Sequence, residues 1–229
     1  MIVNHKYKFI FIKTQKTAGT SIETALSKFC SPTDVVTPIS VKDEEYRKSL
    51  GFQSPVNYSI PLKYYSTEDY LNLFLKGRKK YFYNHMSCEE IRRYLGADIF
   101  DSYYKFCFER NPYDKFLSLF FHHGGFQRWN SLEEFINKGE LEIIKGFDQY
   151  TIKKVIAVDD IFKYEEMDSA LALISEKLEL EERLKLPPVR LKGQFRTDKS
   201  HYTEIITPSV RKMIDIIWAR ELELMNYGF

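Results

Sequence analysis

The sequence predicts an α/β fold, with a central, mainly parallel sheet that helices flank on both sides. Two apolar, aromatic-rich segments, residues 9–12 and 103–108, are typical of buried strands. Each is followed by a polar turn and then by apolar residues at helical spacing. Because strand–turn–helix units usually arrange their strands in parallel, these two units define the predicted sheet.

Length and composition restrict the class of protein. The 229 residues favour one domain with a sizeable core, which we assign to residues 1–229. Hydrophobic residues make up 44% and charged residues 29%, so a globular chain is expected. The formal net charge of +2 argues against a broad nucleic-acid-binding surface. The 3 cysteines are too few for a disulfide framework and are expected to be reduced core thiols.

The sequence shows neither a membrane span nor a leader peptide. No run approaches the roughly 20 apolar residues that cross a bilayer. The first residues lack the ordered charged, apolar and cleavage segments of a signal peptide. As written, the sequence therefore predicts a cytoplasmic protein, and it carries no indication of an oligomeric state.

The segment after the first strand predicts a helix, because Ile22, Ala25, Leu26 and Phe29 share one helical face. Residues 31–65 then hold half of the 8 prolines and show little periodicity. We expect an irregular excursion there, and long loops of this kind often form lids or binding segments. It is the candidate acceptor-binding loop, although an insertion without function explains the same pattern.

Two shorter strands and one more helix follow from local patterns. Residues 81–83 and 158–164 are the strand candidates. Ser66 is a good N-cap for a helix. The apolar face of that helix consists of Leu71, Phe74 and Leu75.

Helix starts are also predicted at four later points. Ser87 and Glu90 have the spacing of a capping box. Pro112 suits the first helical position after the second strong strand. Ser131 begins a short helix, and a final helix is expected over residues 207–224.

The turn after the first strand carries the clearest chemistry. It contains Lys16, Thr17, Ala18, Gly19, Thr20 and Ser21. A helix N-terminus attracts anions, and Gly19 allows a bound group to approach the backbone closely. The nucleotide-triphosphate pattern G-x-x-x-x-G-K-[ST] is not met, because Lys16 precedes the glycine. A phosphate-like ligand is therefore indicated, but not an ordinary ATPase or GTPase.

This turn, placed after an aromatic-rich strand, resembles the 5′-phosphosulfate loop of sulfotransferases. It is most similar to the carbohydrate type, the group that includes heparan sulfate 2-O-sulfotransferase. The resemblance implies a P-loop-NTPase-like three-layer fold. It also implies 3′-phosphoadenosine 5′-phosphosulfate (PAPS) as co-substrate, the 3′,5′-bisphosphate PAP as product, and residues 16–21 as the phosphosulfate-binding loop.

The second strand–helix unit carries a further match. Arg110 and Ser118, eight residues apart, resemble the motif that binds the 3′-phosphate of the donor. An arginine at a strand end can grip a phosphate with two parallel hydrogen bonds. Without the upstream loop, a surface salt bridge of Arg110 and a solvated Ser118 would explain these residues equally well.

Weaker matches extend the resemblance over most of the chain. Residues 162–167 resemble a strand end before a late helix, and residues 218–229 resemble the terminal helix and its aromatic end. Residues 187–203 resemble a nucleotide-covering loop. Within it, Arg196 and Lys199 either close over the adenosine phosphate or are solvated loop charges.

His85 is the candidate general base. A hydroxyl group must lose its proton as it attacks sulfur, and a neutral imidazole suits that task. The helix beginning near Ser87 disfavours the protonated ring. Relatives place their catalytic histidine in a similar strand-to-helix segment, although a purely structural histidine also fits. Glu23 and Glu109 are the alternative bases.

Lys16 is the second candidate catalytic residue, because an ammonium can stabilise the charge that builds up on the leaving group. In the other interpretation it contributes only affinity. The predicted reaction moves a sulfuryl group in line from PAPS to an acceptor hydroxyl, expected on a saccharide, without a metal ion. The alternatives are a P-loop small-molecule kinase using Asp159 or Asp160 for magnesium, and a non-catalytic module that binds a nucleotide or an anionic glycan.

Overall fold

The computed structural model describes residues 1–188, 198 and 200–229. Its central sheet has the strand order β3-β1-β2-β4-β7. Strands β2, β4 and β7 are parallel, and β1 runs antiparallel to both of its neighbours. The prediction of a mixed α/β protein with a mostly parallel sheet is therefore confirmed. The strands are β1 (Ile2–Asn4), β2 (Phe9–Ile12), β3 (Val35–Val36), β4 (Tyr104–Glu109) and β7 (Asp160–Lys163).

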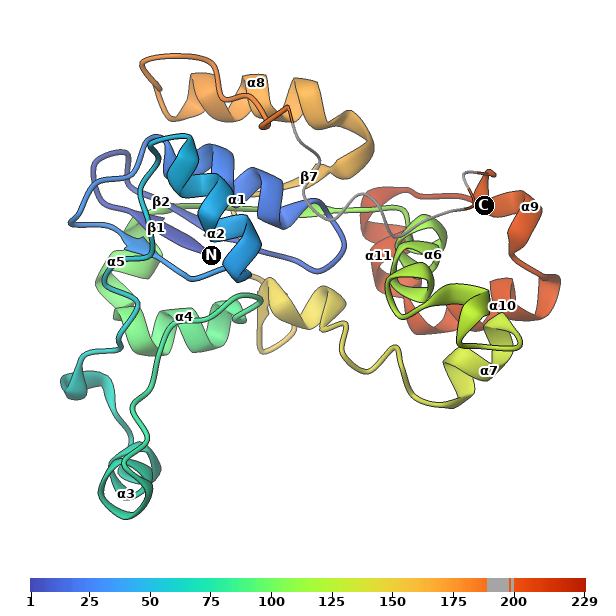
Figure 1. Ribbon diagram of the computed structural model, residues 1–229, viewed down its shortest axis with the longest axis horizontal. Helices are drawn as coiled ribbons and strands as arrows, with labels where there is room; N and C mark the ends of the chain where they lie inside the picture. Colours follow the sequence, from blue (N-terminus) through green and yellow to red (C-terminus); the bar gives the residue numbers. More distant parts are fainter. Residues whose placement is uncertain (189–197, 199) are drawn as a thin grey trace.

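Helices cover both faces of this sheet (Figure 1). Because successive strand residues point to opposite faces, Phe9 and Phe11 pack on one side and Ile10 and Ile12 on the other. All four are fully buried. The first face carries α1 (Gly19–Ser27) and α8 (Met167–Lys177), and the second carries α4 (Cys88–Leu95) and α5 (Ala97–Ser102).

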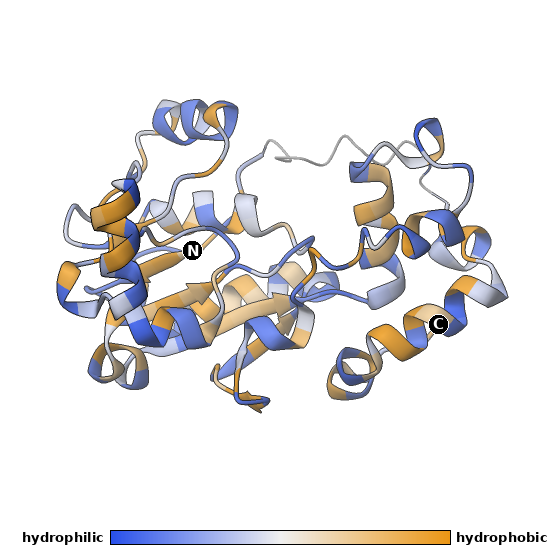
Figure 2. Ribbon diagram, turned by 90° about the horizontal axis from the view of Figure 1, so that it is seen from below, coloured by the Kyte–Doolittle hydropathy of each residue, from blue (hydrophilic) through white to orange (hydrophobic). Residues whose placement is uncertain are grey.

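A helical group with its own core lies beyond the carboxyl ends of the parallel strands (Figure 1). It is built around aromatic residues such as Phe116, Phe120 and Trp218, all of them buried. Figure 2 shows the strands mostly in the hydrophobic colour, whereas the helices carry both colours. The helices of this group are α6 (Pro112–His122), α7 (Leu132–Asn137), α9 (Tyr202–Ile205), α10 (Pro208–Ile217) and α11 (Ala219–Met225).

The remaining elements are short or peripheral. Helix α3 stands away from the rest of the molecule at the end of an extension (Figure 1). Strands β5 and β6 pair as a small hairpin. The bounds are α2 (Val41–Ser49), α3 (Thr67–Lys76), β5 (Thr151–Ile152), β6 (Val155–Ile156), and the 3-10 turns η1 (Leu62–Tyr64), η2 (Gly125–Gln127), η3 (Gly146–Gln149) and η4 (Tyr164–Glu166).

Three expectations need correction. Residues 31–65 are not irregular throughout, because they supply β3 and the helix α2, which Ser40 caps. Residues 81–83 form no strand; Tyr81 makes only an isolated bridge to Ser59. The last helix is interrupted at Trp218, whose φ of −114° and ψ of 30° leave the helical range.

Candidate active site

The loop between β2 and α1 folds back against the neighbouring strand. The hydroxyl of Thr14 donates a hydrogen bond to the carbonyl of Phe108, at the end of β4. Thr14 and Thr17 are also joined through their hydroxyl oxygens, 2.9 Å apart. Lys16 and Ala18 adopt left-handed backbone conformations, with φ of 63° and 58°. The chain therefore makes a tight turn that β4 supports from one side.

Helix α1 starts without a side-chain cap. Its N-cap residue is Ala18, which makes no side-chain cap hydrogen bond. The first residues of the helix, Gly19, Thr20 and Ser21, are buried in the fold. A helix start of this kind keeps its positive end available to an anion.

Gly19 is required by a close approach within the loop. A Cβ at this position would lie 2.7 Å from Cγ of Lys13 and 3.4 Å from the carbonyl oxygen of Thr14. The conformation of Gly19 does not need a glycine, since its φ is not positive. Its small size instead lets the Lys13 side chain pass beneath the helix start.

Lys13 lies in a buried polar cluster that sequence reasoning missed. Its ammonium is 2.6 Å from Oε2 of Glu23 and 2.9 Å from Oδ1 of Asn84. The amino group of Met1 is 3.2 Å from the other Glu23 oxygen and donates to Thr37. Burial raises the pKa of the Glu23 carboxyl, but the charges of Lys13 and the Met1 amine outweigh it, and the pKa is lowered overall. Glu23 is therefore an ion-pair partner and is poorly placed to serve as a base.

His85 lies against the same loop. Its Nδ1 is 2.8 Å from the carbonyl oxygen of Lys13, which also accepts a 2.5 Å hydrogen bond from Nε2 of Gln149. Burial and the nearby charge of Lys13 lower the pKa of His85 to about 4. A carbonyl can only accept, so Nδ1 of the neutral ring carries the proton. Nε2 is then the basic atom, as a general base requires.

Arg110 joins the second strand–helix unit to the loop. Its Nη1 donates to the carbonyl oxygen of Lys16 at 3.1 Å. Its Nε and Nη2 donate to Asp114 at 2.9 and 2.5 Å, and the guanidinium lies 4.3 Å from the ring centroid of Tyr164. The two segments predicted to bind anions therefore meet at the carboxyl edge of the sheet.

The remaining predicted residues divide into three cases. Ser118 is half-buried on α6, two turns beyond Arg110. Glu109 is fully buried and its Oε1 lies 2.5 Å from Nζ of Lys115, so this carboxylate is already neutralised. Arg196 and Lys199 lie outside the described residues.

Contacts between segments far apart in the chain complete this edge, and the sequence does not reveal them. Asn111 caps α6, and its backbone N–H donates to Glu165 at 2.8 Å. The same Glu165 accepts a hydrogen bond from the hydroxyl of Tyr227 at 2.7 Å, which ties the C-terminal segment to the strand ends. Only the aromatic ending of the chain hinted at this contact.

The fold is a mostly parallel sheet flanked by helices, with the loop and Arg110 meeting at the carboxyl ends of its parallel strands. Comparison with known proteins identifies the family: the model of the sulfotransferase family matches residues 1–228, and the chain belongs to this family. An uncharacterized protein of Archaeoglobus fulgidus is 37% identical over 100 residues, which cover 41% of this chain and 82% of that protein. No solved structure matches the chain.

Two features are absent from the described residues. No group of three or more His, Cys, Asp or Glu side chains within residues 1–188, 198 and 200–229 is arranged to hold a metal ion. Over the same part of the chain, no helix is both long and apolar enough to cross a bilayer.

Proposed function

We propose that this protein transfers a sulfuryl group from PAPS to a hydroxyl group of a carbohydrate acceptor. Membership of the sulfotransferase family supports sulfuryl transfer in general. The observation that carries the proposal further is the 3.1 Å hydrogen bond from Arg110 to the Lys16 carbonyl. It brings together two cationic segments whose sequences resemble the 5′-phosphosulfate and 3′-phosphate motifs of this family.

In this proposal the loop works as a phosphate-binding loop. Residues 16–21 hold the phosphosulfate through the uncapped start of α1, the Lys16 ammonium and the nearby hydroxyls. Arg110, with Ser118, takes the 3′-phosphate. The fit has one notable feature: Asp114 already neutralises Arg110, so a 3′-phosphate shares or displaces that carboxylate. In either case the aromatic ring of Tyr164, on which the guanidinium stacks, keeps it in place.

The chemistry of the chain itself then follows from two side chains. PAPS supplies the sulfuryl group. His85 is neutral at physiological pH, and its Nε2 accepts the proton of the attacking hydroxyl. The ammonium of Lys16 stabilises the charge that develops on the departing phosphate oxygen, an effect worth roughly 3–4 kcal/mol for one such group.

The position of the candidate magnesium ligands argues against the kinase alternative. Asp160 begins β7 and pairs with Lys177, and Asp159 binds the backbone N–H of Lys105, near the start of β4. Since β2, β4 and β7 are parallel, these carboxylates lie at the edge of the sheet opposite the loop. They are out of reach of a nucleotide held at residues 16–21.

Transfer of labelled sulfate from PAPS to a panel of oligosaccharides tests the proposal. We expect a labelled product with at least one saccharide and its loss in Lys16→Ala. Binding of PAP without transfer to any acceptor would favour a non-catalytic binding module. Transfer to phenols or proteins but to no saccharide would retain the enzyme class and overturn the acceptor assignment.

A further inference from the structure

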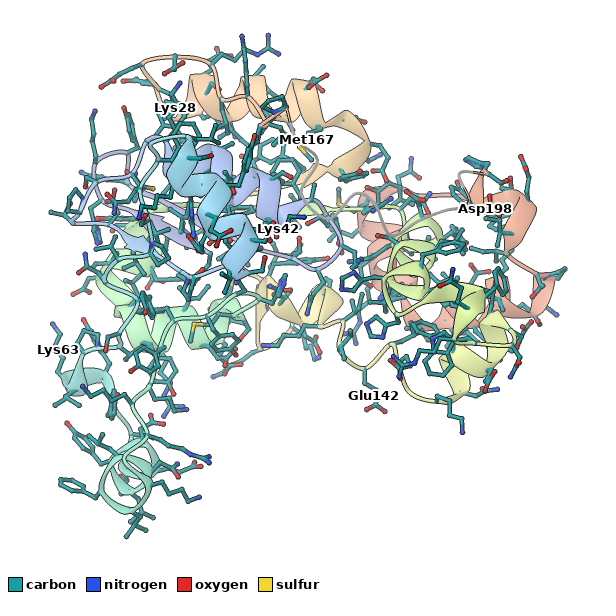
Figure 3. All side chains as sticks on the ribbon, viewed as in Figure 1. Lys28, Lys42, Lys63, Glu142, Met167 and Asp198 are labelled. Carbon is teal, nitrogen blue, oxygen red and sulfur yellow. The ribbon has the colours of Figure 1, made fainter. Side chains whose placement is uncertain are left out.

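Helix α3 exposes the apolar face that an amphipathic helix normally buries. Leu71, Phe74 and Leu75 occupy positions i, i+3 and i+4, and they are 57%, 82% and 72% exposed. The ribbon places α3 away from the other elements (Figure 1), and its side chains extend into open space (Figure 3). Leu62, on the turn that precedes α3, is 52% exposed. These four side chains are the exposed apolar residues of the arm, the name used here for residues 61–80, and those on α3 form its apolar surface.

The arm is firmly attached at its base. The backbone N–H of Ile60 donates to the carbonyl of Lys80 at 3.1 Å, so the two ends of the arm are joined. Asp69, which is buried, forms a 3.0 Å ion pair with Lys80 and accepts a hydrogen bond from Tyr94 at 3.2 Å. These contacts hold the first turn of α3 against the body. The exposed apolar face is therefore a feature of an ordered helix.

Exposed basic residues outnumber exposed acidic ones on the arm. Of the two acidic residues of the arm, Glu68 is exposed, whereas Asp69 is buried and paired with Lys80. Figure 3 labels Lys63 on η1, the turn that precedes α3. The exposed basic residues are Lys63, Lys76, Arg78 and Lys79.

We propose that the arm docks on an anionic lipid surface. A helix with an apolar face and flanking basic residues inserts that face at the boundary of the headgroups and binds acidic lipids through its charges. The aliphatic side chains of Leu71 and Leu75, 57% and 72% exposed, match the acyl–headgroup boundary better than a polar glycan. A second copy bound face to face would bring both sets of lysines together, and like charges repel. This inference does not depend on the proposed reaction.

Co-sedimentation of the full-length chain with vesicles tests the proposal. The probes are vesicles of phosphatidylcholine alone and of phosphatidylcholine mixed with phosphatidylserine. We expect binding to the mixed vesicles, weakening as salt is added, and little binding to the neutral ones. Equal binding to both vesicle types, or binding to neither, overturns the proposal.

Variants separate the apolar and the charged contributions. Phe74→Ser should lower vesicle affinity ~10-fold or more, as expected for one large side chain that leaves an apolar phase. Its control is Ile216→Ser on α10, where the wild-type side chain is 79% exposed and should not matter. Lys79→Glu should weaken binding to the mixed vesicles, whereas Lys138→Glu, at an exposed site on another element, should not.

The same variants identify a different occupant. A self-association in sedimentation velocity that Phe74→Ser abolishes, without vesicle binding by the wild type, would assign the surface to a second copy and overturn the lipid proposal. All four substituted positions are exposed, so circular dichroism should show unchanged folding.

Discussion

Helices α1 and α3 begin in opposite ways. Ser66 accepts a hydrogen bond from the N–H of Asp69, and the Asp69 carboxylate accepts one from the N–H of Ser66. Helix α3 thus satisfies its first turn with its own side chains. Helix α1 follows Ala18, in a left-handed conformation, and has no side-chain cap. A side-chain cap stabilises a helix by about 1 kcal/mol, and the start of α1 lacks this stabilisation.

The difference separates a structural helix start from one suited to a ligand. The start of α3 is complete without a ligand, whereas that of α1 follows a loop whose Lys16 carbonyl accepts a hydrogen bond from Arg110 and whose Lys13 carbonyl contacts His85. We infer that an anion completes it. The predictions below test whether the two helix starts respond differently when they are altered, beginning with the largest expected effect.

His85→Gln should lower turnover ~10²–10⁴-fold, because it removes a general base while keeping a side chain of similar size. Donor affinity should change little, since Nε2 faces the acceptor in the proposed reaction. Rates and PAP binding are to be measured side by side. His122→Gln, at an exposed site at the end of α6, is the control. Full turnover in His85→Gln would assign this histidine to structure alone.

Lys16→Ala should lower turnover ~10²–10³-fold, the usual cost of losing one charge that stabilises a transition state. Lys8→Ala is a matched control, because Lys8 also has a left-handed backbone, with φ of 51°, at the other end of β2. If Lys16→Ala raised only KM for PAPS, the ammonium would contribute binding and not catalysis.

The lowered pKa of His85 predicts that the stability of the protein depends on pH. Its pKa is about 4 in the folded state, against an ordinary 6.5, so the unfolded chain takes up a proton first as the pH falls. The stability that the neutral ring contributes to the folded state is complete above pH 6.5 and is lost as the pH falls from 6.5 to about 4. Urea unfolding over this range should show a loss on the order of 2 kcal/mol in the wild type that His85→Gln lacks. Parallel pH profiles of the two proteins would contradict the shifted pKa.

Gly19→Ala should destabilise the protein by about 1–3 kcal/mol, because the new methyl group meets Lys13 at the helix start. Gly228→Ala is the control, since nothing lies within 4 Å of a Cβ there. Chemical denaturation measures both. An unchanged midpoint in Gly19→Ala would show that Lys13 moves aside without cost.

Ser66→Ala should cost about 1 kcal/mol through loss of the cap of α3, with PAP binding unchanged. Lys16→Ala and Gly19→Ala alter the start of α1, whereas this variant alters a helix start that has a structural role only. Thermal unfolding and calorimetry are the measurements. A loss of PAP affinity in Ser66→Ala would remove the distinction between the two helix starts.

Local patterns predicted the centre of the fold. The strand over residues 9–12, the strand predicted over 103–108 and found over 104–109, the helix behind Pro112, and the helix starts at Ser66 and Ser87 all depend on neighbouring residues. Short edge elements were missed for the opposite reason. Strand β3 has 2 residues and exists only because it pairs with β1.

The sequence shows the residue types of the candidate site but not the contacts between them. The residue types in the loop and at Arg110 are visible in the sequence. The pairing of Lys13 with Asn84, 71 residues away, depends on tertiary structure and leaves no local signal. The apolar face of α3 was predicted from periodicity, but periodicity does not reveal whether another element covers a face.

The central claim is that two cationic segments clasp one nucleoside bisphosphate. Calorimetry with PAP and ATP, on the wild type, Arg110→Ala and Arg128→Ala, tests it most directly. Arg128 also stacks on an aromatic ring, at 4.9 Å from that of Trp129, so it controls for loss of a stacked arginine. We predict that the wild type prefers PAP, that Arg110→Ala lowers PAP affinity ~10–100-fold, and that Arg128→Ala does not. ATP binding as tight as PAP binding, with no effect of Arg110→Ala, would contradict the account.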